Sequence, residues 1–168
     1  MYNELTAKDI EKMQAELDDR INNIRPELIE EVKRTRAFGD LSENYEYKAA
    51  KQAKNRNDSR IRYLEKMIQT AKIISDNTAS DGSAGLFDKI TVYMPEDDEE
   101  TVIQVVTTVR CDPLSGFISK ESPLGKAVLG KKAGDSFIVK VSDDYSYEVQ
   151  VRAVEHASDD GSAPLLQY

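Results

Sequence analysis

Two long runs with helical periodicity, separated by the short stretch GDLSENYEY (residues 39–47), constrain the fold of this chain more than any other feature. In the first run, apolar residues recur at steps of three and four, which places them along one face of a helix. These residues are Ile10, Met13, Leu17, Ile21, Ile24, Leu28 and Val32. Because a tight turn separates this run from the second one, the sequence predicts an antiparallel helical hairpin of the coiled-coil type.

The first helix is expected over roughly residues 6–37. Thr6 and Asp9 resemble a capping box at its start. Pro26 lacks a backbone donor, so it should kink the helix or begin a new segment, although the apolar stripe continues through it. Gly39 follows at a place where the end of a helix favours a residue that tolerates positive φ.

The second helix is expected from about Leu41 to Ser75. Its inward face is predicted to consist of Tyr45, Ala49, Ala53, Tyr63 or Leu64, Met67, Ala71 and Ile74. The alanines near the turn would allow the two helices to approach closely. Farther along, the seam is polar at Arg56, Asn57 and Arg60, and we expect loose packing there.

The second half of the chain has the pattern of a small sheet domain. Strand-like runs at 89–94, 101–109, 136–141 and 145–154 predict a compact antiparallel sheet. Ser122 followed by Pro123 predicts a short helix from Pro123 to about Leu129. The expected fold is therefore α+β, with the hairpin over 1–76, a linker over 77–87, the sheet domain over 88–156 and a disordered tail over 157–168. Within that tail, Leu165 and Leu166 could dock on the domain.

The composition excludes several classes of protein. No apolar run approaches the roughly 20 residues that cross a bilayer, and the first residues lack the pattern of a signal peptide. A single cysteine and a single histidine rule out an internal disulfide and a structural zinc site. We expect a cytoplasmic protein without a membrane association, in which a nucleophilic triad built on His156 is improbable.

The net charge of −8 is unevenly distributed along the chain. All of it comes from residues 77–168, whereas residues 33–62 carry an excess of five positive charges. An acidic protein binds nucleic acid poorly when free, but a partner could deliver this basic arm to RNA. The residues that could then follow an RNA backbone are Lys48, Lys51, Lys54, Arg56 and Arg60. The alternative is a solvated charged face that keeps the hairpin soluble.

The stretch between the helices carries two acids three residues apart, Asp40 and Glu43. Spacing alone favours a capping box, with Asp40 as the N-cap and Glu43 reaching back to it. The two carboxylates could also hold a magnesium ion, but only weakly, because the ion takes six oxygen ligands. If they take part in chemistry, a partner must supply the other ligands, as in two-metal phosphodiester hydrolysis.

Two separate motifs resemble the bacterial Gre transcript-cleavage factors. The first is GDLSENYEYKAAK (39–51), preceded by RPELIEEVKRTRAF (25–38), and the second is ISKESPLGKAVLGKKAGD (118–135). The resemblance covers about residues 5–155 in the same order. It implies an N-terminal coiled coil that enters the secondary channel of RNA polymerase and stimulates cleavage of backtracked nascent RNA. It also implies a C-terminal domain of FKBP-like fold, without isomerase activity, that docks at the rim of the channel.

The resemblance assigns roles to particular residues. Asp40 and Glu43 fall on the acid pair that the family contributes to the polymerase active site, where they would share a magnesium ion with the polymerase. The residues that would support the tip are Gly39, Ser42, Asn44 and Tyr47, and those that would dock at the rim are Ser122, Pro123 and Gly125. The protein would be a monomeric accessory factor that binds no metal stably by itself.

The chain departs from the family pattern in three places. Tyr45 stands where these factors usually have alanine, the segment VTTVRCDPLSG (106–116) follows the pattern only loosely, and the tail beyond about Glu155 has no counterpart. Two other functions remain open. One is a secondary-channel binder that inhibits the polymerase. The other is a coiled-coil interaction module in which the tip acids serve only as a cap.

Overall fold

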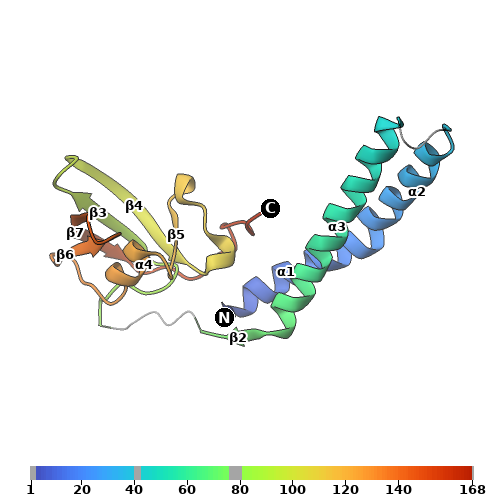
Figure 1. Cartoon of the computed structure of the whole chain (residues 1–168). Helices are drawn as coiled ribbons and strands as arrows, with labels where there is room; N and C mark the ends of the chain where they lie inside the picture. Colours follow the sequence, from blue (N-terminus) through green and yellow to red (C-terminus); the bar gives the residue numbers. More distant parts are fainter. Residues whose placement is uncertain (1–2, 40–42, 76–80, 168) are drawn as a thin grey trace. The chain divides into compact units, whose positions relative to one another are not determined.

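The computed structural model describes residues 3–39, 43–75 and 81–167 (Figure 1). The described residues form two compact units: a helical unit, mainly residues 9–72, and a sheet unit, mainly residues 81–167 together with residues 4–8. The predicted α+β fold, a helical hairpin followed by a small sheet domain, is confirmed. None of the helices described is long and apolar enough to cross a bilayer.

The first arm of the hairpin is a continuous helical run in three parts. Helix α1 (Ala7–Asp19) leads into a π-helical segment (Arg20–Ile24), which leads into α2 (Arg25–Arg36). Pro26 lies in the first turn of α2, where its missing N–H is tolerated. The backbone N–H of Arg25 instead bonds to the carbonyl of Arg20, which closes the wider π turn. The sequence predicts a kink or a new segment at Pro26, and the helix departs from α-helical geometry in the π-helical segment just before this residue.

The second arm, α3 (Tyr45–Gln69), is shorter than predicted at both ends. At its C-terminal end the chain leaves the helix after Thr70 and forms β2 (Ala71–Ile73), which pairs with β1 (Asn3–Leu5) in a two-stranded sheet. The N–H of Ile74 then bonds to the carbonyl of Leu5 at 2.9 Å. The expectation of helix up to Ser75 was wrong because the backbone of residues 71–73 pairs with strand β1 and does not continue the helix.

The buried face of α3 also differs from the prediction. Its buried residues are Ala50, Asn57, Arg60, Ile61 and Leu64. Leu64 was predicted to face inward, but Tyr45 and Ala49 are exposed. The seam passes through Asn57 and Arg60, as predicted. Arg56, which was also placed in the seam, is exposed.

The polar part of the seam is closely paired, not loose as predicted. The Nε and Nη2 atoms of Arg60 each donate to one carboxylate oxygen of Glu16, both at 2.9 Å. Arg20 donates to the same carboxylate at 2.7 Å and to the side-chain oxygen of Asn57 at 3.0 Å. Burial raises the pKa of Glu16, but the bonds from Arg60 and Arg20 outweigh it, so the pKa is lowered. These bonds favour one register between the helices.

We expect Glu16→Gln to destabilise the helical unit by on the order of 2 kcal/mol at pH 7, because it leaves the largely buried Arg60 without its charge partner. The Glu16 pKa is lowered on folding, so its stabilising effect is present above its ordinary value of 4.5 and is lost as the pH falls through the folded-state pKa. Urea unfolding followed by far-UV circular dichroism at pH 7 and at pH 3 measures both effects. A difference between variant and wild type that stays constant with pH would contradict the assignment.

The sheet unit is built on five strands in the order β5-β4-β3-β7-β6. The strands are β3 (Lys89–Met94), β4 (Glu99–Val106), β5 (Phe117–Ser119), β6 (Ser136–Lys140) and β7 (Ser146–Glu155). All neighbours are antiparallel except β4 and β5, which are parallel. The prediction of a purely antiparallel sheet was wrong at this edge. There the chain leaves β4 through two short 3₁₀ turns (Thr108–Arg110 and Pro113–Ser115) and returns as a three-residue strand.

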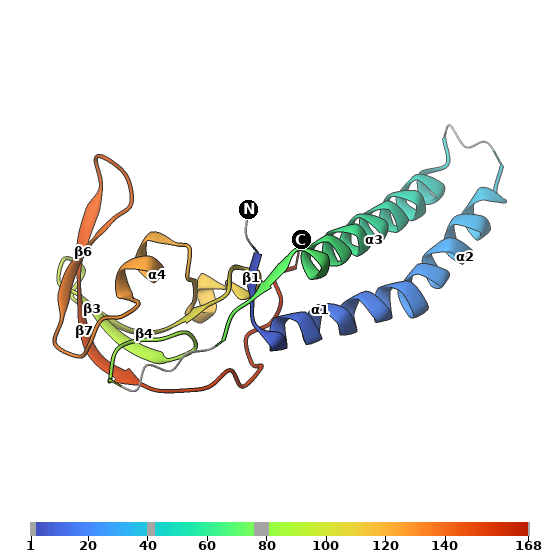
Figure 2. The ribbon, with the colours of Figure 1, turned by 90° about the horizontal axis from the view of Figure 1, so that it is seen from below.

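Helix α4 (Pro123–Val128) packs against the apolar face of the sheet (Figure 2). It begins where Ser122 and Pro123 predict it. Its Val128 is fully buried among the alternating inward residues of the strands. The central members of this core are Ile90, Val92, Val105, Val139 and Val149. Their period of two confirms the strand prediction for this half of the chain.

The segment after β7 is packed on the sheet unit, in contrast to the predicted disordered tail. Arg110 is fully buried, and its guanidinium donates to the carboxylate of Asp159 and, at 3.3 Å, to the carbonyl of Ala163. The guanidinium carbon lies 4.8 Å from the ring centre of Phe87. The N–H of Leu166 bonds to the carbonyl of Val109 at 2.7 Å. The tail is ordered because a buried cation requires the partners that it supplies.

We expect Asp159→Asn to destabilise the sheet unit by about 3 kcal/mol, because the buried guanidinium of Arg110 loses its counter-charge. Asp160→Asn, one residue along at an exposed position, is the matched control and should have little effect. Urea unfolding followed by amide resonances of β3 and β7 measures the change within this unit. Equal stabilities of the two variants would show that the tail is not needed to hold Arg110.

Candidate functional site: the tip of the helical hairpin

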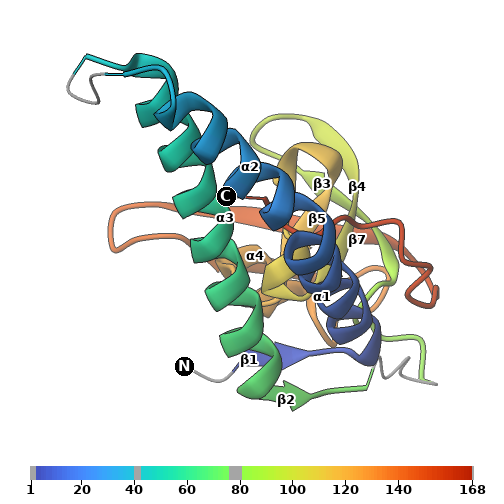
Figure 3. The same cartoon turned by 90° about the vertical axis from the view of Figure 1, so that its right-hand side faces the viewer.

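The candidate site lies where the two arms of the hairpin end together. Figure 3 shows α2 and α3 running side by side toward this tip. Gly39, Glu43, Asn44 and Tyr47 are among the described residues. Asp40 and Ser42, for which the sequence predicts roles, lie outside them.

Asn44 connects the two helices at the tip. Its side-chain oxygen accepts a hydrogen bond from the N–H of Tyr47 at 3.0 Å, which caps the start of α3. Its side-chain amide donates to the carbonyl of Thr35 at 2.8 Å, in the last turn of α2. Thr35 is itself buried. One side chain therefore satisfies an unpaired donor of one helix and an acceptor of the other.

In this geometry Glu43 does not lie in the first turn of α3, and Asp40, the other member of the predicted capping box, lies outside the described residues. The capping-box interpretation requires a helix that begins just after Asp40, with Glu43 inside its first turn. Helix α3 instead begins at Tyr45, and its N-cap is Asn44. Glu43 precedes the cap and is exposed. Several residues in this stretch can cap a helix. The local sequence pattern does not reveal the long-range bond from Asn44 to Thr35, which favours Asn44.

The tip surface carries two exposed aromatic side chains. Phe38, just after α2, is 61% exposed, and Tyr45, at the start of α3, is 81% exposed. A cation lies over each ring, Arg34 at 5.3 Å from the centre of Phe38 and Lys48 at 5.5 Å from that of Tyr45. Between the helices, Gly39 adopts the positive φ of +107° that was predicted for this position.

Three of the five cations predicted to face RNA lie on the surface of α3, whereas Arg60 is buried in the seam and pairs with Glu16. Lys48, Lys51 and Arg56 are exposed. Lys54 is half-buried and pairs with Asp58 at 2.7 Å, and Asp58 also meets Arg25 of α2 at 3.2 Å. The hydrogen bond from Lys54 is the main reason that the pKa of Asp58 is lowered. Lys54 is thus part of the contact between the helices, and the three exposed cations are better placed to meet a phosphate backbone.

The residues predicted to dock at the channel rim lie at the start of α4. The Ser122 hydroxyl accepts from the N–H of Gly125 at 3.0 Å and donates to the carbonyl of Ser119 at 2.7 Å. Gly125 is buried, and a Cβ there would lie 2.1 Å from the carbonyl oxygen of Ser119. Both residues are therefore required by the local fold. Pro123 is exposed and available to a partner.

A magnesium ion at the tip would need more ligands than the two predicted acids supply. Within the described residues, no three histidine, cysteine or acidic side chains gather into a group that could hold an ion. Glu43 can supply carboxylate oxygens at the tip, and Asp40 lies outside the described residues. Two carboxylates fall short of the six oxygens that Mg²⁺ takes. The donor set suits an ion that is shared with another molecule.

Comparison with known proteins identifies the family. The model described as "Transcription elongation factor, N-terminal" matches residues 3–73, and the one described as "Transcription elongation factor, GreA/GreB, C-term" matches residues 79–156. Transcription elongation factor GreA of Oenococcus oeni is 41% identical over 154 residues, which cover 91% of this chain and 94% of the relative. The chain belongs to the GreA/GreB family of transcription elongation factors.

The similarity extends to a second curated relative, and a solved structure is reported beside it. Transcription elongation factor GreA of Mesoplasma florum is 40% identical over 147 residues, which cover 87% of this chain and 94% of the relative. Among solved structures, GreA factor homolog 1 (Gfh1) of Thermus thermophilus is 25% identical, with a TM-score of 0.42 and coverage of 93% of this chain and 100% of that chain. The GreA/GreB model ends at residue 156, so the tail that holds Arg110 lies beyond the matched region.

Asn44 variants test the geometry of this tip. We expect Asn44→Ala to weaken the first turn of α3 by about 1 kcal/mol through the lost cap. Asn44→Asp keeps the cap, because aspartate caps about as well as asparagine, but loses the donor to Thr35. Amide hydrogen exchange at Tyr47 and Lys48 should therefore accelerate in the alanine variant and change little in the aspartate variant. Equal acceleration in both variants would mean that the bond to Thr35, not the cap, holds the start of the helix.

Proposed function

We propose that this GreA/GreB family protein binds RNA polymerase, enters its secondary channel with the helical hairpin and stimulates the polymerase's own cleavage of backtracked nascent RNA. The observation that carries the proposal is the position of Glu43. Asn44 occupies the capping site, so the fold does not use Glu43 to begin α3. An exposed carboxylate at the end of a long arm is free for a role in a partner.

The hairpin forms a long arm. Helix α3 contains 25 residues, and at 1.5 Å per residue it is about 37 Å long. Its seam is fixed by the paired Glu16 and Arg60, which favours a single register along the arm. The exposed Lys48, Lys51 and Arg56 follow the tip along α3. In the proposed complex these cations contact the phosphates of the displaced RNA.

The chemistry divides between the two proteins. Asp40 and Glu43 contribute carboxylate oxygens, and the polymerase contributes the remaining ligands. Together these groups would hold a magnesium ion, which would supply an activated water for hydrolysis of a phosphodiester. The chain itself is an accessory factor and not an enzyme. We further propose that it acts as a monomer in the cytoplasm, where its partner works.

Conservative variants of the tip acids test this function in stalled, backtracked elongation complexes. We expect Glu43→Gln and Asp40→Asn each to reduce release of short 3′ RNA fragments on the order of 100-fold, because each removes a charged oxygen ligand. Polymerase binding, measured by competition with labelled wild-type protein, should persist. Glu46→Gln, an exposed acid in the first turn of α3, is the matched control and should cleave normally. Higher magnesium, or manganese, should partly restore cleavage by the tip variants.

Other outcomes separate the alternatives. Near-normal cleavage by both tip variants would contradict the metal role of the acids. Wild-type protein that binds polymerase but slows RNA synthesis without releasing fragments would identify an inhibitory channel binder. Wild-type protein that does not bind polymerase at all would leave only a coiled-coil interaction module.

A further inference from the structure

Strand β6 leaves one edge of the five-stranded sheet open. It is the last strand in the order, and among the described residues no other strand pairs with its outer side. The N–H of Val151 bonds to the carbonyl of Asp135, and the N–H of Val141 bonds to that of Tyr145. These bonds fix the register, so the odd-numbered residues of β6 direct their backbone groups at β7. The backbone N–H and C=O groups of Ser136, Ile138 and Lys140 therefore point outward, where another strand could form hydrogen bonds with them.

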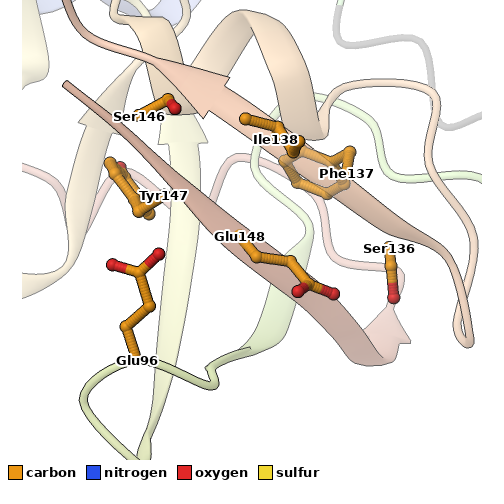
Figure 4. A pocket seen from close by; sticks show the side chains of 7 residues that line it. All are labelled: Glu96, Ser136, Phe137, Ile138, Ser146, Tyr147 and Glu148. Atoms are coloured by element: carbon orange, nitrogen blue, oxygen red, sulfur yellow. The ribbon is translucent and has the colours of Figure 1, made fainter. Parts of the chain in front are cut away.

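The side chains along this edge form an apolar anchor point. Ile138 is 70% exposed, on the face of the sheet opposite to the buried Val139. It lies directly opposite Glu148 of β7 in the strand register. A hollow of about 390 Å³ adjoins it, lined by Glu96 and by residues 136–138 and 146–148 (Figure 4). Val141 and Tyr145, at the turn that follows β6, are also exposed.

The same end of the sheet is strongly acidic. Residues 95–100 and 138–148 together contain eight acids and one lysine. The register of β3 and β7 places both turns at this end, because β7 continues past Met94 toward its own start at Ser146. Glu96 and Glu148 line the hollow beside Ile138. The lysine, Lys140, is paired with Asp143 at 2.9 Å.

The charge decides what can occupy the edge. A second copy of this chain would bring the same acidic residues to the edge, and two chains that each carry a net charge of −8 repel each other. Nucleic acid is repelled for the same reason. An extended segment with alternating basic and apolar side chains can instead pair with the outward backbone groups, bury Ile138 and meet Glu96 and Glu148. We propose that the free edge of β6 is a docking site for an extended, positively charged segment of a partner protein, which adds to the sheet as a further strand.

A peptide that carries only these features is the probe. An acetylated and amidated heptapeptide alternating lysine and valine is titrated into the ¹⁵N-labelled full chain, and a peptide alternating glutamate and valine is the charge control. We expect saturable shifts for the basic peptide, confined to the amides of β6, β7 and the 95–100 turn, and none for the acidic peptide. No saturation with the basic peptide, shifts elsewhere, or equal binding of both peptides would overturn the proposal.

Variants separate the roles of side chain and backbone. Ile138→Lys should weaken binding by about tenfold or more, because it removes the anchor and adds a like charge. Leu114→Lys adds the same charge at a 100% exposed position of the same unit and should bind as wild type. Ile138→Pro removes an N–H that faces outward, so it should keep the fold and abolish strand addition. Wild-type affinity in both Ile138 variants, or self-association of the chain through β6 in sedimentation, would refute the docking site.

Discussion

The hydrogen bonds of Asn44 determine how the hairpin ends. By capping α3 and bonding to the last turn of α2, this side chain ties the two arms together at the tip. It also leaves Glu43 before the start of the helix, so Glu43 does not cap α3. The proposed function depends on these separate roles, in which Asn44 caps the helix and Glu43 remains available to a partner. Had Glu43 been the residue that holds the cap, its removal would disturb the tip and its chemistry together.

Each unit of the protein also contains a buried arginine whose partner lies far away in the sequence. Arg60 meets Glu16 across the hairpin, and Arg110 meets Asp159 of the tail. Buried ion pairs add little net stability compared with apolar packing, but a missing partner is costly. They therefore act mainly by selecting one arrangement: the register of the helices in one unit, and the path of the tail in the other. The paired polar residues of the seam fix how the two helices align, which suits an arm whose free end has no apolar core to hold the helices together.

Patterns that repeat along the chain were predictable from the sequence, and those that depend on distant partners were not. The apolar stripe of the first arm, strand β3 and the start of α4 follow from local periodicity and capping chemistry. The start of α3 was misplaced because Asp40, Ser42 and Asn44 are all good caps, and only the bond to Thr35 distinguishes them. Loose packing was predicted at Asn57 and Arg60 because polar residues interrupt the apolar stripe and the pattern does not show that they pair with polar residues of the other arm across the hairpin. The tail was predicted to be disordered because its few apolar residues do not indicate that it pairs with the buried Arg110.

In the proposed complex the tip of this hairpin reaches the active centre of RNA polymerase. The most direct test places a photo-crosslinking amino acid at position 43 of the otherwise wild-type chain, bound to a backtracked elongation complex. We expect crosslinks to the 3′ segment of the RNA and to polymerase residues around the catalytic metal. Crosslinks confined to the outer surface of the polymerase, from a protein that still binds it, would contradict the proposed function.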